Sequence, residues 1–290
     1  MQISIILLTY NNIRFVDNFI KSIYGQSFKD FELIIVDNYS TDGPVEKINS
    51  LNLKNAKLIQ FKNFGNMAAS RNLGIRNAKF DYIAFHDSDD FWFNNKLDNC
   101  VKELNKFDFV YHNMIIKSEE SGKKLKSTFR YQINNKIKGH MLEQGNPVAT
   151  SSVVCCKKIK NNLIQFNENK KLMAIEDFEL WLRLSLEGFK FKYIDKNLGY
   201  LLERKQSESK IKINKIHGYK LILNKYKKYI PNKTYKRANI YQKYLFANIL
   251  FLSKKQKSLN FFKFSLIKSE FFRIKYLSFI KIFKILFKIN

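Results

Sequence analysis

The sequence has no glycine before Gly25, and this absence excludes one common kind of ligand site. Apolar runs of strand length alternate with segments of helical spacing between Ile3 and His112, which predicts a mostly parallel α/β sheet. Such sheets often bind a dinucleotide on a glycine-rich turn after the first strand, but the turn here is Thr9-Tyr10-Asn11-Asn12. We therefore expect neither a dinucleotide site nor the glycine-rich loop of a nucleotidyltransferase.

Two further absences concern the compartment. No charge-free apolar run approaches the ~18 residues that a membrane-spanning helix needs, and the first residues, MQISIILLTYNN, lack the basic region and cleavage site of a signal peptide. The three cysteines, Cys100, Cys155 and Cys156, are odd in number and have no metal-site spacing, so we expect buried thiols in a reducing compartment. Together these features predict a cytoplasmic protein.

Acidic residues are nearly missing from the end of the chain. Residues 210–290 contain 21 lysines and arginines and a single acid, Glu270, so they carry +20 of the net charge of +27. Residues 1–209 carry the remaining +7. With 45% hydrophobic residues the chain has enough apolar content for a core, and its charge divides it into a mildly basic body and a strongly basic tail.

The tail interleaves aromatic and aliphatic residues with lysine. Near its end, Lys281, Lys284 and Lys288 are three and four residues apart and share one face of a helix. This pattern predicts a basic amphipathic helix on an anionic membrane surface, formed by 260–290. One alternative is a helical hairpin over 219–251 that packs on the body with its lysines solvated. A second is RNA binding, but the chain has no RNA-binding motif and its aliphatic content favours lipid, so no nucleic-acid partner is expected.

Three carboxylates follow the apolar run 82–85 within a few residues. These are Asp87, Asp89 and Asp90, and like charges at one strand end repel unless a cation or a donor-rich ligand joins them. Asp87 and Asp89 are two residues apart, which suits a hard divalent cation that also takes phosphate oxygens. The alternative is a helix cap, with Asp89 or Asp90 opening a helix at Phe91.

The periodicity of the sequence sets the remaining expected elements. Strands are expected over 3–8, 31–36, 56–61, 82–85 and 107–112, and helices over 13–24, 45–51, 67–77 and 91–104. Beyond these we expect a hairpin turn at 118–122, a strand over 148–154, a helix through Phe178, Trp181 and Leu182, and strands over 190–194 and 200–204.

Polar residues follow several of the expected strands. Ligands of an open α/β sheet lie outside the carboxyl ends of its strands, where Thr9-Tyr10-Asn11, Asp37-Asn38 and Asp87-Ser88-Asp89 should meet. An acid for a base N–H, the arginine Arg71 for phosphates and a carboxylate pair for a metal together describe a pocket for a nucleoside diphosphate. Taken singly, Thr9 and Asn11 could be caps, Asp37 a turn residue and Arg71 a surface charge.

Glu176 and Asp177 stand at the start of an expected helix. Acids are favoured there by the helix dipole, which is one explanation for them. The other is that one of the two is a general base directed into the same pocket.

Five segments of the chain, in this order, resemble the inverting glycosyltransferases of family 2, which have the GT-A fold. They are ISIILLTYNN, QSFKDFELIIVDNYSTDG, AASRNLGIRNAKFDYIAFHDSDDFW, TSSV and IEDFELWLRL. The resemblance covers about residues 1–205 and implies an α/β fold with a Rossmann-like, mostly parallel central sheet flanked by helices. It implies a transferase domain over 1–205, with a nucleotide-binding half (1–113) and an acceptor-binding half (114–205). A helical basic tail over 206–290 would follow.

The resemblance also implies roles for individual residues. The nucleotide-sugar would be bound by Thr9, Tyr10, Asn11, Asp37, Asn66, Arg71, Asp87 and Ser88. Asp37 would meet the uracil edge, and Asp89 with Asp87 would hold Mn²⁺ or Mg²⁺. Asp177 would be the catalytic base, with Glu176 beside it. All of these residues would then share one cleft.

The function implied is transfer of a sugar from a UDP-hexose or UDP-N-acetylhexosamine to a hydroxyl of a lipid-linked, lipopolysaccharide or capsule glycan, at the inner face of the cytoplasmic membrane. The alternative is a sugar-nucleotide-binding scaffold that has lost catalysis. Two departures from the family pattern stand out. Asn38-Tyr39 replaces the commoner Asp-Gly, and no clear histidine follows the Asp177 helix as a third metal ligand. Either the metal affinity is then weak, or Arg204 and Lys205 assist the diphosphate instead.

Overall fold

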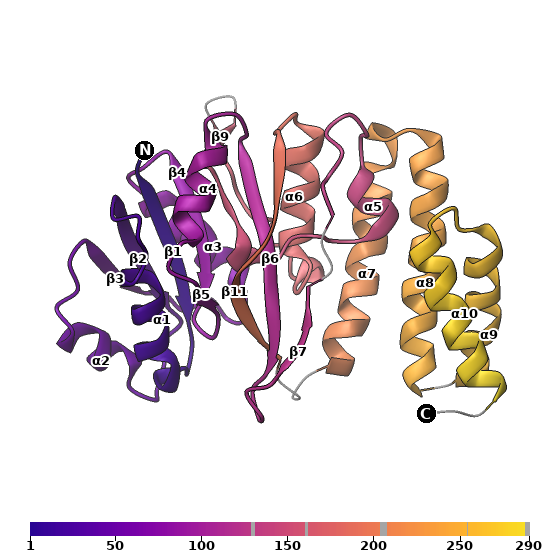
Figure 1. The fold of residues 1–290 in the computed structure, drawn as a ribbon, viewed down its shortest axis with the longest axis horizontal. Helices are drawn as coiled ribbons and strands as arrows, with labels where there is room; N and C mark the ends of the chain where they lie inside the picture. The colour runs from indigo at the N-terminus through magenta and orange to yellow at the C-terminus, as the bar shows by residue number, and fades with distance from the viewer. Residues whose placement is uncertain (129–130, 160–161, 204–207, 254, 288–290) are drawn as a thin grey trace. The chain divides into compact units, whose positions relative to one another are not determined.

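The computed structural model describes residues 1–128, 131–159, 162–203, 208–253 and 255–287 (Figure 1). The chain forms two compact units. The first contains 1–135, 147–170 and 187–205, and the second contains 136–146, 171–186 and 206–290. Two short segments of the expected transferase domain thus group with the tail. Compact units and functional domains are different divisions, so the domain over 1–205 stays a prediction.

Strands dominate the first unit. They are β1 (Ile3–Thr9), β2 (Phe31–Asp37), β3 (Ala56–Gln60), β4 (Tyr82–Asp87), β5 (Phe91–Trp92), β6 (Phe109–Ser118), β7 (Lys124–Ser127), β8 (Val154–Cys156), β9 (Lys158–Ile159), β10 (Asn162–Leu163) and β11 (Phe191–Glu203). Its helices are α1 (Val16–Tyr24), α2 (Pro44–Ser50), α3 (Met67–Asn77) and α4 (Lys96–Leu104), with 3₁₀ turns at Ile13–Phe15 and Thr150–Ser152.

The central sheet has the strand order β3-β2-β1-β4-β8-β6-β11-β5, with β7 added beside β6. Strand β1 is parallel to β2 and β4, β2 is parallel to β3, and β6 is parallel to β11, whereas β8 is antiparallel to both of its neighbours. The α/β class with a mostly parallel sheet is therefore confirmed. Because β1 to β4 are parallel, their carboxyl ends lie at one edge of the sheet.

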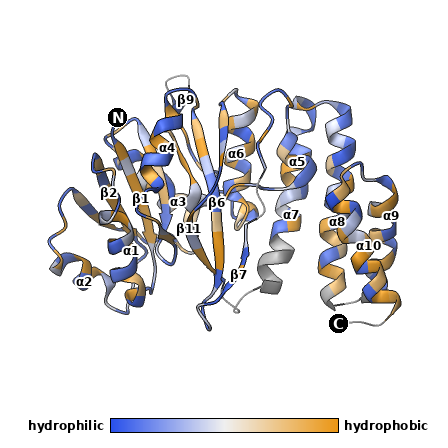
Figure 2. Ribbon diagram, in the orientation of Figure 1, coloured by the Kyte–Doolittle hydropathy of each residue, from blue (hydrophilic) through white to orange (hydrophobic). Residues whose placement is uncertain are grey.

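Apolar side chains on both faces of the sheet form the core of the first unit. Every residue of β2 is buried, and hydrophobic residues fill β1 and β2 in Figure 2. Phe19 of α1 and Leu97 of α4 pack with Ile5 and Leu33 on one face. On the other face α3 approaches so closely that a Cβ at Gly74 would lie 2.4 Å from Ile6 Cγ2. Each large apolar side chain buried in this way contributes roughly 1.5–3 kcal/mol.

The helix expected over 91–104 is wrong at its start. Phe91 and Trp92 form β5, which pairs with Tyr200 and Gly199 of β11, and the helix begins only at Lys96. A Cβ at Gly199 would lie 2.4 Å from Phe91 O, so glycine permits this close strand pairing. The alternative in which Asp89 or Asp90 caps a helix at Phe91 is therefore wrong.

Two other expected elements differ from the structure. The strand expected over 148–154 is a 3₁₀ turn at Thr150–Ser152 followed by β8, because the Ser152 N–H and hydroxyl both bond Ala149 O. The strands expected over 190–194 and 200–204 are one strand, β11, whose pairing with β6 shifts register between Ile194 and Tyr200. The hairpin turn expected at 118–122 is observed between β6 and β7.

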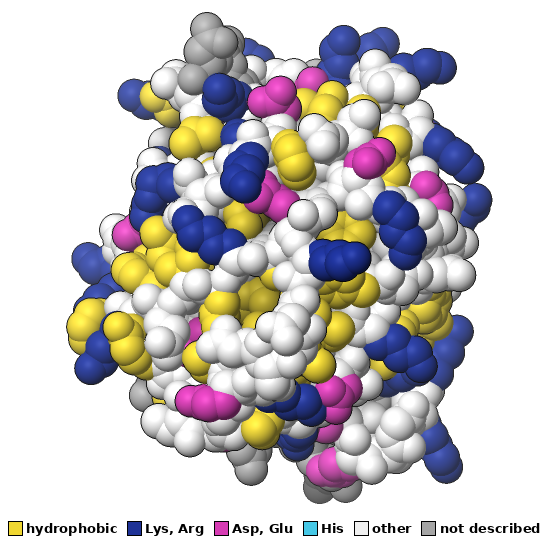
Figure 3. All heavy atoms as spheres, turned by 90° about the vertical axis from the view of Figure 1, so that its left-hand side faces the viewer, with side chains coloured by type: hydrophobic (Ala, Val, Ile, Leu, Met, Phe, Trp, Pro, Cys, Tyr) yellow, Lys and Arg dark blue, Asp and Glu magenta, His cyan; other side chains and the backbone are white. Residues whose placement is uncertain are grey.

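The face of the first unit that Figure 3 presents carries charges of both signs. Lysine and arginine side chains are spread over it, with acidic side chains between them. Such mixed surfaces agree with the modest net charge of residues 1–209. The three cysteines are free, with Cys100 and Cys155 buried, as the sequence predicts.

Helices form the second unit. They are α5 (His140–Gln144), α6 (Glu176–Leu186), α7 (Glu208–Tyr226), α8 (Asn232–Ser253), α9 (Lys255–Lys268) and α10 (Phe272–Leu286). The ring of Phe178 on α6 stacks on Tyr219 of α7 with 5.8 Å between centroids, and the Tyr219 hydroxyl donates to Leu142 O of α5. The hairpin alternative for 219–251 is thus what the structure shows, with α5 and α6 as its packing partners.

Two ion-pair clusters fasten the helices of this unit. Glu179, fully buried on α6, accepts bonds of 2.6 Å from both Lys225 Nζ and the Tyr226 hydroxyl of α7. Arg237 of α8 pairs with Glu270 and lies 3.6 Å from the buried carboxylate of Glu143 on α5. Glu270, the one acid of residues 210–290, is therefore used in packing within this unit.

Helix α10 is apolar on two sides. Ile282 and Ile285 join Ala247, Phe251 and Phe262 in a small core with α8 and α9. A second row is exposed to solvent, made up of Phe272, Tyr276, Phe279, Phe283 and Leu286. The helix is therefore part of a bundle rather than a single amphipathic element. No helix in the described ranges is both long enough and apolar enough to span a bilayer.

Candidate functional site

The end of β4 brings two of the predicted site residues together. Arg71, which α3 carries and which is 3% exposed, donates from Nη2 to Asp87 Oδ1 at 3.2 Å. Its guanidinium also lies 5.3 Å from the ring centroid of Phe166. Arg71 is therefore a buried, fixed cation beside a partly exposed carboxylate, and the alternative of a surface charge is wrong.

Hydrogen bonds hold the turn after Asp87 against the end of β1. The Ser88 N–H donates to Leu8 O at 3.1 Å, and Asn12 Nδ2 donates to Ser88 Oγ at 2.7 Å. The Asp87 N–H donates to Ser151 Oγ at 3.0 Å. These bonds fix the turn that carries Asp87 and Asp89 on either side of Ser88, and both of these residues are partly exposed.

A buried layer under this turn was not predicted from the sequence. His86 Nδ1 lies 2.8 Å from Asp87 O, which requires the proton on Nδ1, and burial lowers the pKa of His86 to about 4. Its ring packs 4.6 Å from that of Trp92, whose Nε1–H donates to Ser151 O at 2.7 Å. His86 and Trp92 therefore form a buried support for the turn Asp87-Ser88-Asp89, the acidic turn. Both residues belong to the sequence segment HDSDDFW. The sequence does not show their contacts, because these depend on strand β5.

The turn after β2 closes on Asp37. This carboxylate is fully buried and accepts bonds from the Ser40 N–H (2.9 Å) and the Ser40 hydroxyl (2.5 Å). The alternative of a turn residue is thus observed, and the contact of Asp37 with a uracil edge stays a prediction. Tyr39, where glycine is commoner, has a left-handed backbone with φ +54°.

The exit of β1 holds the other predicted donor-binding residues. Thr9 is buried, and its hydroxyl has no hydrogen-bond partner in the described part of the chain. Tyr10 is exposed, whereas Asn11 is used within the protein, since its N–H donates to Ser40 Oγ and its Oδ1 accepts from the Thr41 N–H, both at 2.9 Å. An unpartnered buried hydroxyl at this edge leaves one polar group for a ligand or a solvent molecule.

Asn66 lies just before α3. Its Nδ2 donates to Glu168 O at 2.9 Å, and Asn72 of the same helix donates to Phe166 O and to Glu168 Oε1. Asn66 therefore fastens the segment around Glu168 to α3, and its contact with a donor stays a prediction.

The two candidate catalytic acids belong to the second unit. Asp177 at the start of α6 accepts from the Phe178 N–H at 2.6 Å and from Asn146 Nδ2 at 3.1 Å, and it is more exposed than Glu176, which is 5% exposed. Asp177 is the better placed of the two to take a proton from a ligand. The common cleft of Asp177 with Asp89 stays a prediction, and Arg204 and Lys205 lie outside the described residues.

The acidic turn suits a divalent cation held together with a ligand. Among the described residues, no three acidic, histidine or cysteine side chains gather into a metal-binding cluster. Asp87 and Asp89 offer two partly exposed carboxylates of the hard oxygen type. Mg²⁺ and similar ions are commonly held by one or two carboxylates plus phosphate oxygens, so the donor set fits a metal bound jointly with a diphosphate.

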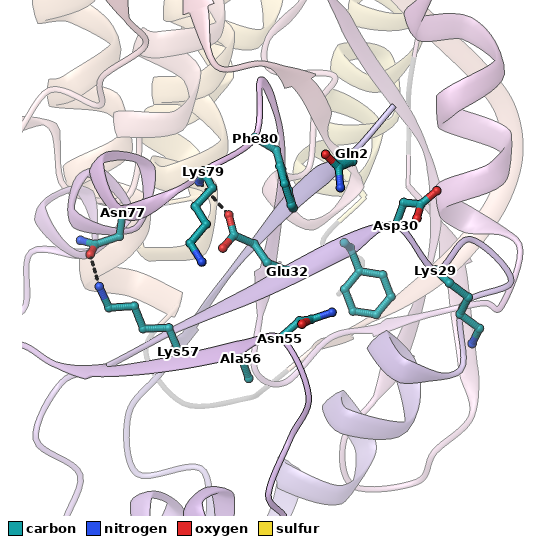
Figure 4. A pocket seen from close by; sticks show the side chains of 11 residues that line it. Gln2, Lys29, Asp30, Glu32, Asn55, Ala56, Lys57, Asn77, Lys79 and Phe80 are labelled. Atoms are coloured by element: carbon teal, nitrogen blue, oxygen red, sulfur yellow. Dashed lines mark hydrogen bonds between the residues drawn. The ribbon is translucent and has the colours of Figure 1, made fainter.

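A hollow elsewhere on the first unit is not this site. It has a volume of about 390 Å³ and is lined by residues such as Lys29, Glu32, Asn55, Lys57 and Lys79 (Figure 4). These residues lie at the amino ends of β2 and β3 and after α3, at the edge of the sheet opposite to the acidic turn. Ligands of open parallel sheets bind at the carboxyl ends of the strands. Asp37, Asp87 and Asp89 lie at those ends and are not part of the hollow.

The chain resembles several curated proteins. It is 32% identical over 190 residues to an uncharacterized glycosyltransferase of Rickettsia conorii, an alignment that covers 63% of this chain but only 30% of the relative. It is 32% identical over 194 residues to WfaP of Escherichia coli, a UDP-Glc:α-D-GlcNAc-diphosphoundecaprenol β-1,3-glucosyltransferase, with 65% of this chain and 72% of WfaP covered. The chain thus spans less than a third of the Rickettsia protein.

Solved structures share the fold. S. aureus TarS in complex with UDP-GlcNAc matches with a TM-score of 0.60 and 18% identity, covering 92% of this chain and 81% of that one. The mannosyltransferase PcManGT from Pyrobaculum calidifontis, in complex with GDP-Man and Mn²⁺, matches with a TM-score of 0.64 and 13% identity, covering 99% and 86%.

A family model decides the assignment. The model of glycosyl transferase family 2 matches residues 4–158, which include β1 to β4, Arg71 and the acidic turn. This match extends over more than half of the 290 residues. The chain therefore belongs to glycosyl transferase family 2.

Proposed function

We propose that this protein transfers a sugar from a nucleotide-sugar to a hydroxyl of a glycan acceptor, with inversion at the anomeric carbon. The observation that carries the proposal is the cluster at the carboxyl ends of β1 and β4, where Arg71 bonds Asp87 and Asn12 bonds Ser88. A buried guanidinium beside two partly exposed carboxylates suits a diphosphate that shares a cation with them. Membership of the family over 4–158 supports the same chemistry.

The donor we propose is a UDP-hexose or a UDP-N-acetylhexosamine. WfaP is named for UDP-Glc, and TarS was solved with UDP-GlcNAc. Arg71 would meet the diphosphate oxygens, and Asp37 would accept from the base. Asp89 and Asp87 would hold Mn²⁺ or Mg²⁺, and the Mn²⁺ of PcManGT supports a divalent ion in this role. When bound, the ion would stabilise the charge that develops on the leaving diphosphate.

The chemical step that we propose uses Asp177 as the general base. Asn146 Nδ2 and the Phe178 N–H orient its carboxylate. The proton of the acceptor hydroxyl passes to Asp177 while that oxygen attacks the anomeric carbon on the face opposite to the diphosphate. The bond from carbon to the diphosphate oxygen breaks in the same displacement, so an α-linked donor gives a β-glycoside.

The acceptor that we propose is lipid-linked, and the protein would be peripheral on the inner face of the cytoplasmic membrane. The WfaP name specifies an undecaprenol-linked acceptor. The exposed row on α10, from Phe272 to Leu286, supports this location because its members recur every three or four residues on one face. Lys275 and Lys284 lie to either side of the row, half-buried, and would meet anionic head groups.

The transfer proposal is tested with the purified protein and a panel of UDP-sugars. We expect UDP release that depends on Mn²⁺ or Mg²⁺ and rises with a polyprenyl-diphosphate-linked glycan. Asp177→Asn and Asp89→Ala should each lower the rate at least about 100-fold, because each removes a group that acts at the reacting atoms. Their urea unfolding midpoints should match that of the native sequence.

Asp17→Asn is the matched control, since Asp17 is an exposed acid on α1 that pairs only with Lys47 among the described residues. It should keep full activity. Full transfer by Asp177→Asn would remove the base assignment. Tight UDP binding with no transfer to any glycan would instead favour a sugar-nucleotide-binding scaffold without catalysis.

A further inference from the structure

Two exposed tyrosines follow neighbouring strands at the edge of the sheet that holds the proposed donor site. Tyr10 follows β1 and Tyr39 follows β2, and Thr9 is the register partner of Asp37 in this parallel pair. The two side chains are 54% and 55% exposed. A large aromatic side chain with so much exposed surface contributes little to the core and is available to a ligand.

Hydrogen bonds tie the two turns together on both sides of the tyrosines. Before them, the Asn38 N–H donates to Thr9 O at 3.1 Å. After them, the Asn11 N–H donates to Ser40 Oγ at 2.9 Å. Tyr10 and Tyr39 are the middle residues of these paired turns, and each ring extends from a backbone that is fixed at both ends.

The backbone conformation of Tyr39 is unusual for a residue with a Cβ. Its φ of +54° lies in the left-handed region, which is unfavourable for a residue with a Cβ and costs glycine almost nothing. The exposed ring recovers little of that cost within the fold. Strain kept at a ligand-binding edge is typical of residues that act on the ligand.

We infer that Tyr39 is a specificity-determining residue whose ring stacks on the nucleobase of the donor, beside Tyr10 and above the buried carboxylate of Asp37. The inference rests on the proposed function and adds a base-binding group to it. Asp37 would bind the hydrogen-bonding edge of the base. The rings of Tyr39 and Tyr10 would lie against the faces or the side of the base. Stacking of a base on an aromatic side chain is worth about 1–3 kcal/mol by alanine substitution, which is roughly 5- to 150-fold in affinity.

The test compares UDP with inorganic pyrophosphate, which lacks the base, by calorimetry in the presence of Mg²⁺. Tyr39→Ala should weaken UDP binding about tenfold and leave pyrophosphate binding unchanged, whereas Tyr39→Phe should bind UDP like the native sequence. In turnover, Tyr39→Ala should raise the donor KM and change kcat little, because stacking acts equally on the ground and transition states.

Tyr39→Gly distinguishes the effect of the ring on UDP binding from the effect of the backbone conformation on stability. It should weaken UDP binding as Tyr39→Ala does, yet raise the unfolding midpoint because glycine relieves the left-handed conformation. Asn55→Gly is the matched control, since Asn55 has φ +55° at the amino end of β3 and should gain stability without a change in UDP binding.

The outcomes are distinguishable. Native affinity of Tyr39→Ala for UDP would overturn the stacking role and leave the proposed transfer intact. An equal loss for UDP and pyrophosphate would also overturn it, because the ring would then act on the loop rather than on the base. A native protein that binds neither UDP nor pyrophosphate would overturn the proposed function and this inference together.

Discussion

Single residues at this site are fixed by partners that lie far away in the sequence. Ser151 accepts from the Asp87 N–H through its hydroxyl and from Trp92 through its carbonyl, although 64 residues separate it from Asp87. Near Trp92, one charged residue, Lys96, is buried at a cost in free energy. This lysine is fully buried, with Nζ 3.5 Å from the Trp92 ring centroid and 3.4 Å from Val153 O.

Lys96 predicts a pH dependence of stability. Burial lowers the pKa of Lys96 from 10.5 to about 8, so between these values the unfolded chain binds more protons than the folded one and stability rises with pH. Relative to Lys96→Met, the native sequence should gain about 3 kcal/mol of unfolding free energy from pH 8 to pH 10.5. Urea denaturation at several pH values measures this difference.

The comparison with a variant reduces the opposing effect of the buried thiols. Burial, the largest cause, raises the pKa of Cys100 to about 11 in the native protein, and Cys100 is equally buried in the variant. Lys102→Met, an exposed position on the same helix, is the control and should show the native pH dependence. A Lys96→Met curve that runs parallel to the native one would contradict the prediction.

At the scale of elements, α3 carries Arg71 and depends on a close approach to β1. A Cβ at Gly74 would lie 2.4 Å from Cγ2 and 3.3 Å from Cγ1 of Ile6. The contact explains a glycine inside a helix, where it otherwise costs about 1 kcal/mol relative to alanine. The position of the helix, and with it the distance from Arg71 to Asp87, therefore depends on the absence of one methyl group.

Gly74→Ala should destabilise the protein by about 1–3 kcal/mol despite the better helix propensity of alanine, because the contact forces α3 away from the sheet. Adding Ile6→Ala should recover part of the loss, since it removes both contacting carbons. Unfolding free energies of the two single variants and the double variant measure this coupling. Additive losses in the double variant would show that the Ile6 contact is not the cause.

At the scale of the whole molecule, charge and apolar surface are divided unequally. Residues 1–209 carry +7 and residues 210–290 carry +20. Figure 3 shows both signs of charge on a face of the first unit, whereas Glu270, the single acid of residues 210–290, is paired with Arg237. The remaining lysines of the tail have few internal counter-charges, which suits an anionic partner.

Membrane docking is tested by flotation with vesicles. The native protein should float with vesicles that contain anionic lipid, bind neutral vesicles much less, and lose binding as salt increases. Replacing Phe272, Phe279 and Phe283 by serine should lower binding at least about tenfold, because each buried aromatic ring contributes on the order of 1 kcal/mol or more.

The control replaces Leu51 and Leu125, two exposed apolar residues of the first unit, by serine and should float like the native protein. Equal flotation of the triple variant would show that the α10 row is not the docking surface. A protein that ignores lipid but retains RNA through a salt titration would reverse the choice of partner.

The sequence by itself determined the elements whose signals are local. Continuous β-branched runs and helical spacing predicted β1 to β4, α1 and α3, and the polar residues after each strand predicted the edge where Arg71 meets Asp87. It did not predict β5, because this strand forms only by pairing with the distant Gly199 and Tyr200. It also did not predict the 3₁₀ turn at Thr150–Ser152, where bonds from Ser152 to Ala149 O replace the expected strand.

The tertiary structure decided what depends on packing between distant segments. It shows that Arg71 is a buried cation and not a surface charge, and that Tyr39 has a left-handed backbone. It also shows that some apolar residues of α10 belong to a core and others to an exposed row. Periodicity records which residues are apolar and at what spacing, but not which neighbour covers each of them. Only the folded chain provides those neighbours, and so only it distinguishes a buried face from a binding face.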